Sequence, residues 1–431
     1  MSPRGEAGRN LRSGTGKRES MLGYWTLRNE MLENKRREEE SILRRTYRIV
    51  SETPVVDFHT HLFAPELGSL NLYGIDELLT YHYLAAEAFT TDRTVTPDQF
   101  YSWPKPKQAD HIWKTLFQDR TPISQATIGV LQVLNAFGFD VNNVTLNEIR
   151  DWYKNEKDII SRVLEIAKVQ RVTMTNDPFH PDEIAAWETG PQIDPRFIPA
   201  LRIDPLINNF ESARPFLDGD TPADAARFLD RWVRKIKPKY MAISLPPNFD
   251  LCSNPYFTDA IIPVCQEHGI AFAMMIGVRR AINPNFGLAG DGVGYANLES
   301  LEAVCNRFPN QTFFATTLAR ENTYGLAVLG RKFPNLRIFG CWWFLNTDSM
   351  MSEMTDLRFE LLGTNVIPQH SDARVFEQLI YKWQDARQVI SICLAKRFEA
   401  LAATGAVVTD DMIQNEATKL LSGNASEWMK L

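Results

Sequence analysis

The chain changes from helical to strand-like patterning at VVDFHTHL, residues 55–62. Pro54 stops the preceding helical pattern, and the apolar run that follows is typical of a buried β-strand. His59 and His61 stand two residues apart at its end. Residues two apart on a strand point to the same side, so both imidazoles can face one metal ion. A strand that simply runs into a polar loop is the alternative explanation for such a pair.

Seven further apolar, β-rich runs follow this strand and are separated by helical stretches. Several are continuously apolar, as strands covered on both faces should be. Eight strands that alternate with helices predict an α/β fold, a (β/α)8 TIM-type barrel. A doubly wound open sheet is the structural alternative, but no GxGxxG motif follows any run. The seven runs are residues 169–175, 197–202, 240–245, 271–277, 312–317, 336–343 and 365–372.

The pattern predicts a single domain over residues 21–431, preceded by a disordered tail over 1–20 that is rich in Arg, Gly and Ser. Residues 25–50 combine helical periodicity with dense mixed charge, which predicts an exposed helix. The long helical stretch between the first two strands predicts an insertion over 63–165. An insertion in the first βα loop lies at the C-terminal face of a barrel, where it can roof the active site.

Composition narrows the class of protein. The net charge of −6 argues against a nucleic-acid partner, which requires a basic surface. No stretch approaches the ~18 consecutive apolar residues of a membrane-spanning helix. The five cysteines are widely spaced without a CxxC motif, which predicts reduced thiols. We therefore expect a soluble, cytoplasmic protein that acts on a small molecule, with no nucleic-acid or membrane partner; a homo-oligomer is left open.

The last predicted strand ends in PQHSDAR, which adds a carboxylate to the two histidines. In a (β/α)8 barrel, reactive residues lie at the C-terminal ends of strands, and the eighth strand neighbours the first. Asp372 can therefore complete a metal site with His59 and His61. His370 shares the face of Asp372, and Arg374 follows in the loop. The alternative for Asp372 and Arg374 is a surface ion pair near a turn.

Arginines stand at the ends of two other predicted strands, with Arg202 as the last residue of the third and Arg279 with Arg280 after the fifth. Guanidinium groups bind carboxylates and phosphates in a bidentate manner. Arginines that converge on the barrel mouth of an acidic protein therefore suggest an anionic group on the substrate. Taken singly, each arginine is equally well explained as a helix cap or an interstrand ion pair.

Aromatic and imidazole side chains supply further candidates. Trp342 and Trp343 end the run over 336–343 and can wall a pocket, although aromatics at a strand end more often belong to the core. His82 and Tyr83 lie in the insertion and can reach the site as proton-transfer or substrate-binding groups. Packing within the insertion is the alternative for both.

Several stretches share their residues and their order with one known family. VVDFHTHL is similar to its D-x-H-x-H-L strand, LNLYGIDELLTYHYLAAEAF to its N-L-Y…D-H-Y-x-x-R-A-M segment, TNDP to T-T-D-D-P, FIPALRID to P-x-x-R-P-D, and GCWWFLNTDSMM to G-x-W-W-F-N-D. This ordered set runs from about Trp25 to the C-terminus. It resembles the uronate isomerase (glucuronate/galacturonate isomerase) family of the amidohydrolase superfamily, as a divergent member.

The resemblance implies an aldose–ketose isomerase of sugar acids, which converts D-glucuronate to D-fructuronate or D-galacturonate to D-tagaturonate through a cis-enediol. It implies that a divalent metal, with zinc as the first expectation, is held by the two histidines of VVDFHTHL and by Asp372. Asp372, Arg374, Tyr83 and His82 would act in catalysis, and the substrate would be bound by Arg202, Arg279, Trp343 and His370. A metal-dependent hydrolase or decarboxylase on the same barrel is the alternative, and a binding protein on an inactive barrel is a third.

Two departures from the family pattern bear on these alternatives. The family has a histidine in an L-H-I-G sequence after the fifth strand, where this chain has Met275. Its fourth strand leads to an Asp-His pair, where this chain reads SLPPNFD. Loss of the fifth-strand histidine disfavours a two-metal hydrolase, because that position commonly supplies a ligand there. We hypothesise that His370 compensates for one of the losses.

Overall fold

The computed structural model describes residues 41–431. The tail predicted over 1–20 lies outside the described residues, as does the first part of the helix predicted over 25–50. The described part of that helix is α2, Ile42–Glu52. It begins after Ser41, whose side-chain oxygen accepts a hydrogen bond from the amide of Arg44.

Seven parallel strands of the described chain form one curled sheet, in the order β1-β2-β3-β4-β5-β8-β9. Each overlaps one of the predicted runs, which confirms the α/β TIM-type fold class, although the run predicted over 336–343 is a strand only at its first three residues. β4 and β5 are buried at every residue, and this explains why their sequences are apolar apart from Ser244 near the end of β4. The strands are β1 Val55–Thr60, β2 Val169–Asn176, β3 Phe197–Arg202, β4 Tyr240–Leu245, β5 Ala271–Ile276, β8 Phe313–Thr317 and β9 Leu336–Ile338.

The eighth predicted strand, 365–372, is a closing segment with little regular pairing. Toward β9 it forms one parallel bridge, Phe339 to Ile367. Toward β1, the amide of Asp372 donates to the carbonyl of His59 at 3.1 Å. The segment therefore joins the last strand of the sheet to the first. It is irregular because Pro368 lacks an amide hydrogen and because φ is 50° at Asp372, outside the range of a strand.

A bulge in β1 turns its first histidine inward. Between Asp57 and Thr60, β1 gains one residue relative to β2. Phe58 stacks on the ring of Tyr240 in the barrel interior, and His59 contacts the hydroxyl of the same tyrosine. Regular alternation along a strand would have placed one of these two neighbours on the outside.

Aromatic side chains fill the barrel interior beneath the site. The ring of Phe58 lies 5.2 Å from that of Tyr240, 5.0 Å from Phe314 and 4.9 Å from Phe339. All four side chains are essentially buried. The barrel is therefore a packed core, and a ligand can enter only at the C-terminal ends of its strands.

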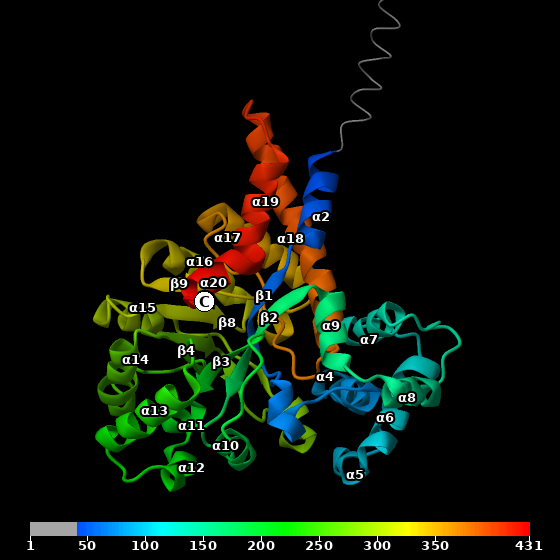
Figure 1. The fold of residues 1–431 in the computed structure, drawn as a ribbon, viewed down its shortest axis with the longest axis horizontal. Helices are drawn as coiled ribbons and strands as arrows, with labels where there is room; N and C mark the ends of the chain where they lie inside the picture. The colour runs from blue at the N-terminus through cyan, green and yellow to red at the C-terminus, as the bar shows by residue number, and fades with distance from the viewer. Residues whose placement is uncertain (1–40) are drawn as a thin grey trace, which may run out of the picture.

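Helices cover the outside of the sheet (Figure 1). The segment between β1 and β2 is also mostly helical. Figure 1 shows α5, α6, α7 and α8 grouped to one side of the sheet, beside α9. That this insertion roofs the active site stays a prediction. Its helices are α3 Ile75–Leu79, α4 His82–Thr91, α5 Pro97–Ser102, α6 Lys105–Trp113, α7 Gln125–Ala136, α8 Leu146–Asn155 and α9 Ile159–Ala167.

The remaining helices follow the later strands. They are α10 Pro181–Glu188, α11 Asp204–Asn208, α12 Phe210–Ala213, α13 Pro222–Ile236, α14 Ile262–His268, α15 Leu298–Arg307, α16 Thr323–Lys332, α17 Asp348–Leu362, α18 Gln378–Ala403, α19 Asp410–Thr418 and α20 Asn424–Trp428. After β5, a short hairpin pairs β6 Val278–Arg279 with β7 Gly292–Val293. All five cysteines are free. Among the described helices, none has both the length and the apolar character needed to cross a membrane.

Candidate metal centre and active site

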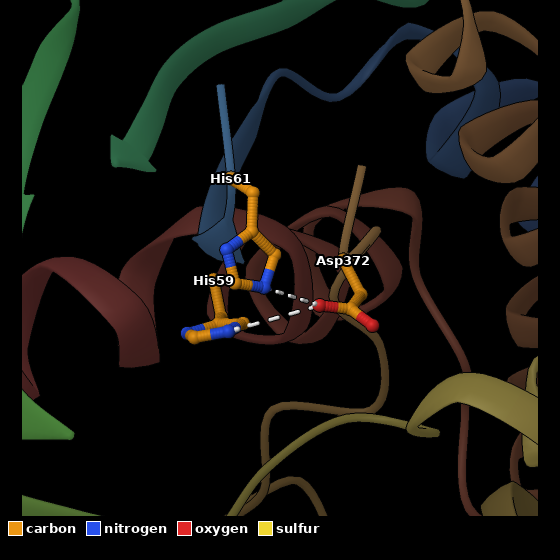
Figure 2. Close-up of side chains that lie close together, drawn as sticks. All are labelled: His59, His61 and Asp372. Carbon is orange, nitrogen blue, oxygen red and sulfur yellow. Dashed lines mark ion pairs between the residues drawn. The ribbon is translucent and has the colours of Figure 1, made fainter. Parts of the chain in front are cut away.

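His59, His61 and Asp372 come together where β1 meets the closing segment (Figure 2). Nε2 of His61 lies 3.3 Å from Oδ1 of Asp372, and Nε2 of His59 lies 3.7 Å from the same oxygen. One potential ligand atom from each residue lies within 4.8 Å of the other two. Two imidazoles and a carboxylate at this spacing could hold a divalent metal ion.

The hydroxyl of Tyr240 determines which nitrogen of His59 carries the proton. That hydroxyl donates its single hydrogen to the carbonyl of Phe58 at 2.8 Å. Nδ1 of His59 lies 3.1 Å from the same oxygen and must be the donor in this contact, because the hydroxyl hydrogen is already used. Nε2 has no hydrogen-bond partner among the described residues. It therefore presents its lone pair toward Asp372, as a metal ligand would.

We expect Tyr240→Phe to weaken metal binding by about tenfold, because His59 loses the acceptor that sets its tautomer. Removal of such a partner typically costs about 10–100-fold in metal affinity. Competition for Zn²⁺ between the protein and a chromophoric chelator measures the change. Tyr153→Phe, in α8 and outside the site, is the matched control. Equal affinity in wild type and Tyr240→Phe would contradict the assigned tautomer.

Both imidazoles are neutral near pH 7. Burial lowers the pKa of His59 and of His61 to about 3, and nearby positive charge from Arg374 adds to the effect on His61. Burial alone would raise the pKa of Asp372, but the contacts of its carboxylate with His61 and the other imidazoles outweigh burial and bring that pKa below its usual range. The three groups are thus already in the protonation state that metal binding requires.

Two residues of the site adopt left-handed backbone without being glycine. φ is 50° at Asp372 and 51° at Trp343. Such backbone costs roughly 1–2 kcal/mol for an ordinary L residue, and less for Asp than for Trp. Strained backbone that the surrounding structure holds in place is typical of functional sites.

A cavity of about 50 Å³ adjoins the three candidate ligands. Tyr81 and Ser244 line it although no motif singles them out. Their signals were positional, since Tyr81 precedes His82 and Ser244 lies near the end of a strand, where barrel sites are built. The predicted residues on the cavity wall are His61, His82, Arg202, Trp343, Asp372 and Arg374, and Met275, Arg280 and Trp342 complete it.

Four predicted residues do not line this cavity, and one of them is the candidate ligand His59. Arg279 ends β6 and is exposed, whereas its neighbour Arg280 reaches the cavity. Tyr83 packs behind the wall, with its ring 4.4 Å from that of His82 and its hydroxyl buried. His370 is fully buried, 5.5 Å from His59 between ring centroids, and neither of its nitrogens has a hydrogen-bond partner in the described chain. The roles predicted for Arg279, Tyr83 and His370 stay predictions.

The arginines of the cavity differ in whether they are already paired with a carboxylate of the protein. Nε and Nη2 of Arg202 donate to the carboxylate of Asp204 at 3.0 and 2.9 Å, which leaves Nη1 without a partner in the described chain. The charge of Asp204 raises the pKa of Arg202 above its usual range. Arg280 pairs with Asp291 at 2.5 Å. Arg374 forms no ion pair with any carboxylate of residues 41–431, so its charge is available to a ligand.

A buried acid stands near Arg202. Glu183 of α10 is only 8% exposed, and its Oε2 accepts a hydrogen bond from the amide of Asp177 at 2.8 Å. Burial raises the pKa of Glu183 from 4.5 to about 8. Between these values the folded state keeps a proton that the unfolded state releases. The carboxyl therefore favours the unfolded state increasingly as pH rises through this window.

We expect Glu183→Gln to be more stable than wild type at pH 7.5, by on the order of 1–3 kcal/mol in the free energy of unfolding. The amide keeps an acceptor for Asp177 and does not ionise. At pH 4 the difference should disappear, because the carboxyl is then protonated in both states. Urea unfolding at the two pH values measures it. A variant that is less stable at both would contradict the buried, protonated carboxyl.

Comparison with known proteins gives relatives only among solved structures. No family model matches the sequence, and no curated protein matches it either. A uronate isomerase from Bacillus halodurans C-125 is 41% identical, with a TM-score of 0.87 over 90% of this chain and 96% of that one. A uronate isomerase from Thermotoga maritima (16% identity, TM-score 0.72, 90% and 97% covered) shares the fold. So does a glucuronate isomerase from Caulobacter crescentus (14% identity, TM-score 0.71, 90% and 94% covered).

The first of these matches extends over nearly the whole of both chains. Its identity is high enough to carry family membership, whereas the other two support the barrel alone. The match also agrees with the motifs VVDFHTHL and GCWWFLNTDSMM, which lie on β1 and after β9. The protein belongs to the uronate isomerase family and is an isomerase.

Proposed function

We propose that the protein is a metal-dependent aldose–ketose isomerase of hexuronates, which interconverts D-glucuronate and D-fructuronate or D-galacturonate and D-tagaturonate. The observation that carries the proposal is one cavity in which a candidate metal centre meets three guanidinium groups. A hexuronate offers both groups that such a cavity can bind. Its carboxylate suits an arginine, and its reacting oxygens suit a metal.

The residues present fit a divalent metal. The buried Nε2 of His59 lacks a hydrogen-bond partner in the described chain and faces the ionised Asp372. We propose zinc, because two neutral imidazoles and a carboxylate suit it and leave a coordination position for substrate. When bound, the ion supplies positive charge beside the oxygens that become anionic during isomerisation.

In the proposed reaction, Asp372, or a group that it orients, takes the proton from C2 of the aldose. Oδ1 of Asp372 faces the two imidazoles while Oδ2 points away from them, which leaves one oxygen for proton transfer (Figure 2). A cis-enediol forms, and the proton is then delivered to C1 while the hydroxyl at C2 becomes the carbonyl. Arg374 and Arg202 bind the anionic groups of the sugar acid. His82 lines the same cavity, and burial lowers its pKa to about 3, so it acts as a neutral imidazole.

The cavity must widen to admit substrate. A volume of about 50 Å³ holds only a few water molecules, less than a six-carbon sugar acid needs. The lining side chains therefore have to move apart on binding. Arg280 lies in the region of the short hairpin β6–β7 and is exposed over most of its side chain, so it is well placed to do so.

The test is turnover by protein that has been stripped of metal and reloaded with Zn²⁺. D-glucuronate and D-galacturonate are followed by proton NMR in ordinary water and in ²H₂O. We expect ketose to form, with deuterium entering C1, because an enediol intermediate lets the transferred proton exchange with solvent. Absence of turnover with every hexuronate, in protein shown to hold metal, would overturn the proposal.

A metal-dependent hydrolase or decarboxylase is not favoured. Met275 lines the cavity from β5, at the position where the sequence resemblance implies a histidine, and a thioether is a poor ligand for a hard or borderline divalent ion. Release of an amine, an alcohol or carbon dioxide from amide, lactone or uronate substrates, without any isomerase activity, would reverse this choice.

Further expectations from the sequence stay predictions. We propose that the partner is a small-molecule sugar acid substrate, that no nucleic acid or membrane is bound, and that the protein acts in the cytoplasm. We also propose a single domain over 21–431 with 63–165 as its insertion. Limited proteolysis and light scattering of the purified chain would test the domain limits and the oligomeric state.

A further inference from the structure

Two buried charged side chains, Asp57 and Lys382, form hydrogen bonds with the peptide groups that precede the candidate ligand Asp372. The amide of Ser371 donates to Oδ1 of Asp57 at 3.1 Å. The carbonyl of Ser371 accepts from Nζ of Lys382 at 2.6 Å. Ser371 and Asp57 are fully buried, and Lys382 is 2% exposed. Ser371 immediately precedes Asp372, so both hydrogen bonds are made one residue before the candidate metal ligand.

The two charged residues come from different parts of the fold. Asp57 lies on β1, two residues before His59, and its Oδ2 accepts a hydrogen bond from Nε1 of Trp383 at 2.8 Å. Lys382 and Trp383 are consecutive in α18. Neighbouring residues of one helix therefore tie it to the strand that carries the histidines and to the segment that carries the carboxylate.

Asp372 needs such support because of its backbone. Its φ of 50° lies in the left-handed region, which an L residue keeps only where its surroundings hold it. Its own amide donates to the carbonyl of His59 at 3.1 Å, which fixes one side of the turn. The carbonyl of that same peptide group accepts from Lys382, and the amide of the preceding peptide group donates to Asp57.

Buried charges also require an explanation of their own. Asp57 and Lys382 form no ion pair within the described chain; each instead bonds a group of the same residue, Ser371. A buried charge is costly unless its hydrogen bonds are satisfied. Apolar residues of similar size would hold α18 against the barrel with a smaller desolvation cost, so docking of the helix alone does not explain these two charges.

We propose that Asp57 and Lys382 are positioning residues, which hold Asp372 so that its carboxylate faces His59 and His61 and which thereby set the affinity for the metal. The inference rests on the proposed function, because it assumes that these three side chains bind metal. It assigns Asp57 and Lys382 no contact with the substrate.

A second buried cation on the same helix provides a matched control. Arg387 of α18 is 7% exposed and donates to the carbonyls of Val50 and Thr53 at 2.5 and 2.7 Å. It thus docks α18 on the chain just before β1, at the opposite end of that strand from the candidate ligands. Lys382 and Arg387 share their helix, their burial and their type of acceptor. They differ in which end of β1 they support.

The experiment compares Lys382→Met, Lys382→Arg, Asp57→Asn and Arg387→Met in the full chain, stripped of metal. Zn²⁺ affinity is measured by chelator competition, and folding by circular dichroism and thermal unfolding of the metal-free protein. We expect Lys382→Met and Asp57→Asn to lose at least about tenfold in affinity, and Lys382→Arg to recover part of it. Arg387→Met should unfold at a lower temperature and keep the affinity of wild type.

The outcomes separate this inference from the function on which it rests. Wild-type affinity in both Lys382→Met and Asp57→Asn would overturn the positioning role while leaving the metal site intact. An equal loss in Arg387→Met would also overturn it, because docking of α18 alone would then explain the effect. If wild type binds no Zn²⁺, the proposed metal site fails first. If Lys382→Met does not fold, Lys382→Arg and Asp57→Asn carry the same comparison.

Discussion

Asp372→Asn is expected to reduce kcat/KM for a hexuronate by at least about a thousandfold and to lower the occupancy of the metal site. The carboxylate supplies the only negative charge of the candidate ligand set, and in the proposed reaction it also takes or directs the proton at C2. Loss of a positioned base alone typically costs about 10²–10⁴-fold in rate. Loss of a charged ligand adds to this. Steady-state kinetics and elemental analysis of the same preparation measure both effects.

The control for this substitution is a second buried carboxylate outside the cavity. Asp385 of α18 is 9% exposed and accepts a hydrogen bond from Gln132 at 2.8 Å. Asp385→Asn removes a charge of similar burial from the same part of the chain. It should change the unfolding temperature without changing the metal content. Kinetics in Asp372→Asn that match those of wild type would exclude this residue from both roles.

Arg374→Met is expected to lower kcat/KM by about 10²–10³-fold while the metal content stays that of wild type. Arg374 lines the cavity and contacts Tyr81, but it has no carboxylate partner within the described chain. The side chain of Arg374 is exposed, so its charge is free to bind an anionic substrate group. Once the substrate covers such a charge pair, deletion of one partner costs about 2–5 kcal/mol. Arg374→Lys should recover only part of the loss, because an ammonium cannot bind a carboxylate through a planar fork.

The control here is Arg320→Met, which removes an arginine of a surface ion pair with Glu353. Exposed pairs of this kind contribute about 0–1 kcal/mol to stability, so neither folding nor kinetics should change measurably. A loss of metal from Arg374→Met would contradict the assignment in a different way. It would show that Arg374 supports the ligands and does not bind the substrate.

The strands were predictable because buried strands consist mostly of apolar residues. β4 and β5 are buried at every position, and Ser244 is the one hydroxyl side chain that these two strands contain apart from the phenol of Tyr240. The closing segment after β9 was harder to predict. Its apolar start suggested a strand, but Pro368 and the left-handed Asp372 prevent regular pairing. The bulge in β1 was not predictable at all, because it depends on how β1 pairs with β2.

The candidate ligands were predictable because strand ends meet in a closed barrel, so His59, His61 and Asp372 could be placed together before their distances were known. The arginine that the β6–β7 hairpin contributes to the cavity wall was not predictable. Arg279 and Arg280 are adjacent in sequence, and the turn of a two-residue hairpin strand decides which of them faces inward. That turn depends on pairing with Gly292 and Val293, which no local pattern reveals.

Closure of the barrel by the segment that carries Asp372 has a consequence for biosynthesis. The two histidines are made early, whereas their carboxylate partner lies more than three hundred positions further along the chain. A nascent chain that has produced β1 through β9 already contains both imidazoles but cannot yet hold metal with all three groups. Contacts between such distant segments form late in folding. Metal uptake should therefore follow completion of the ring, and Zn²⁺ binding would report the finished fold and not its intermediates.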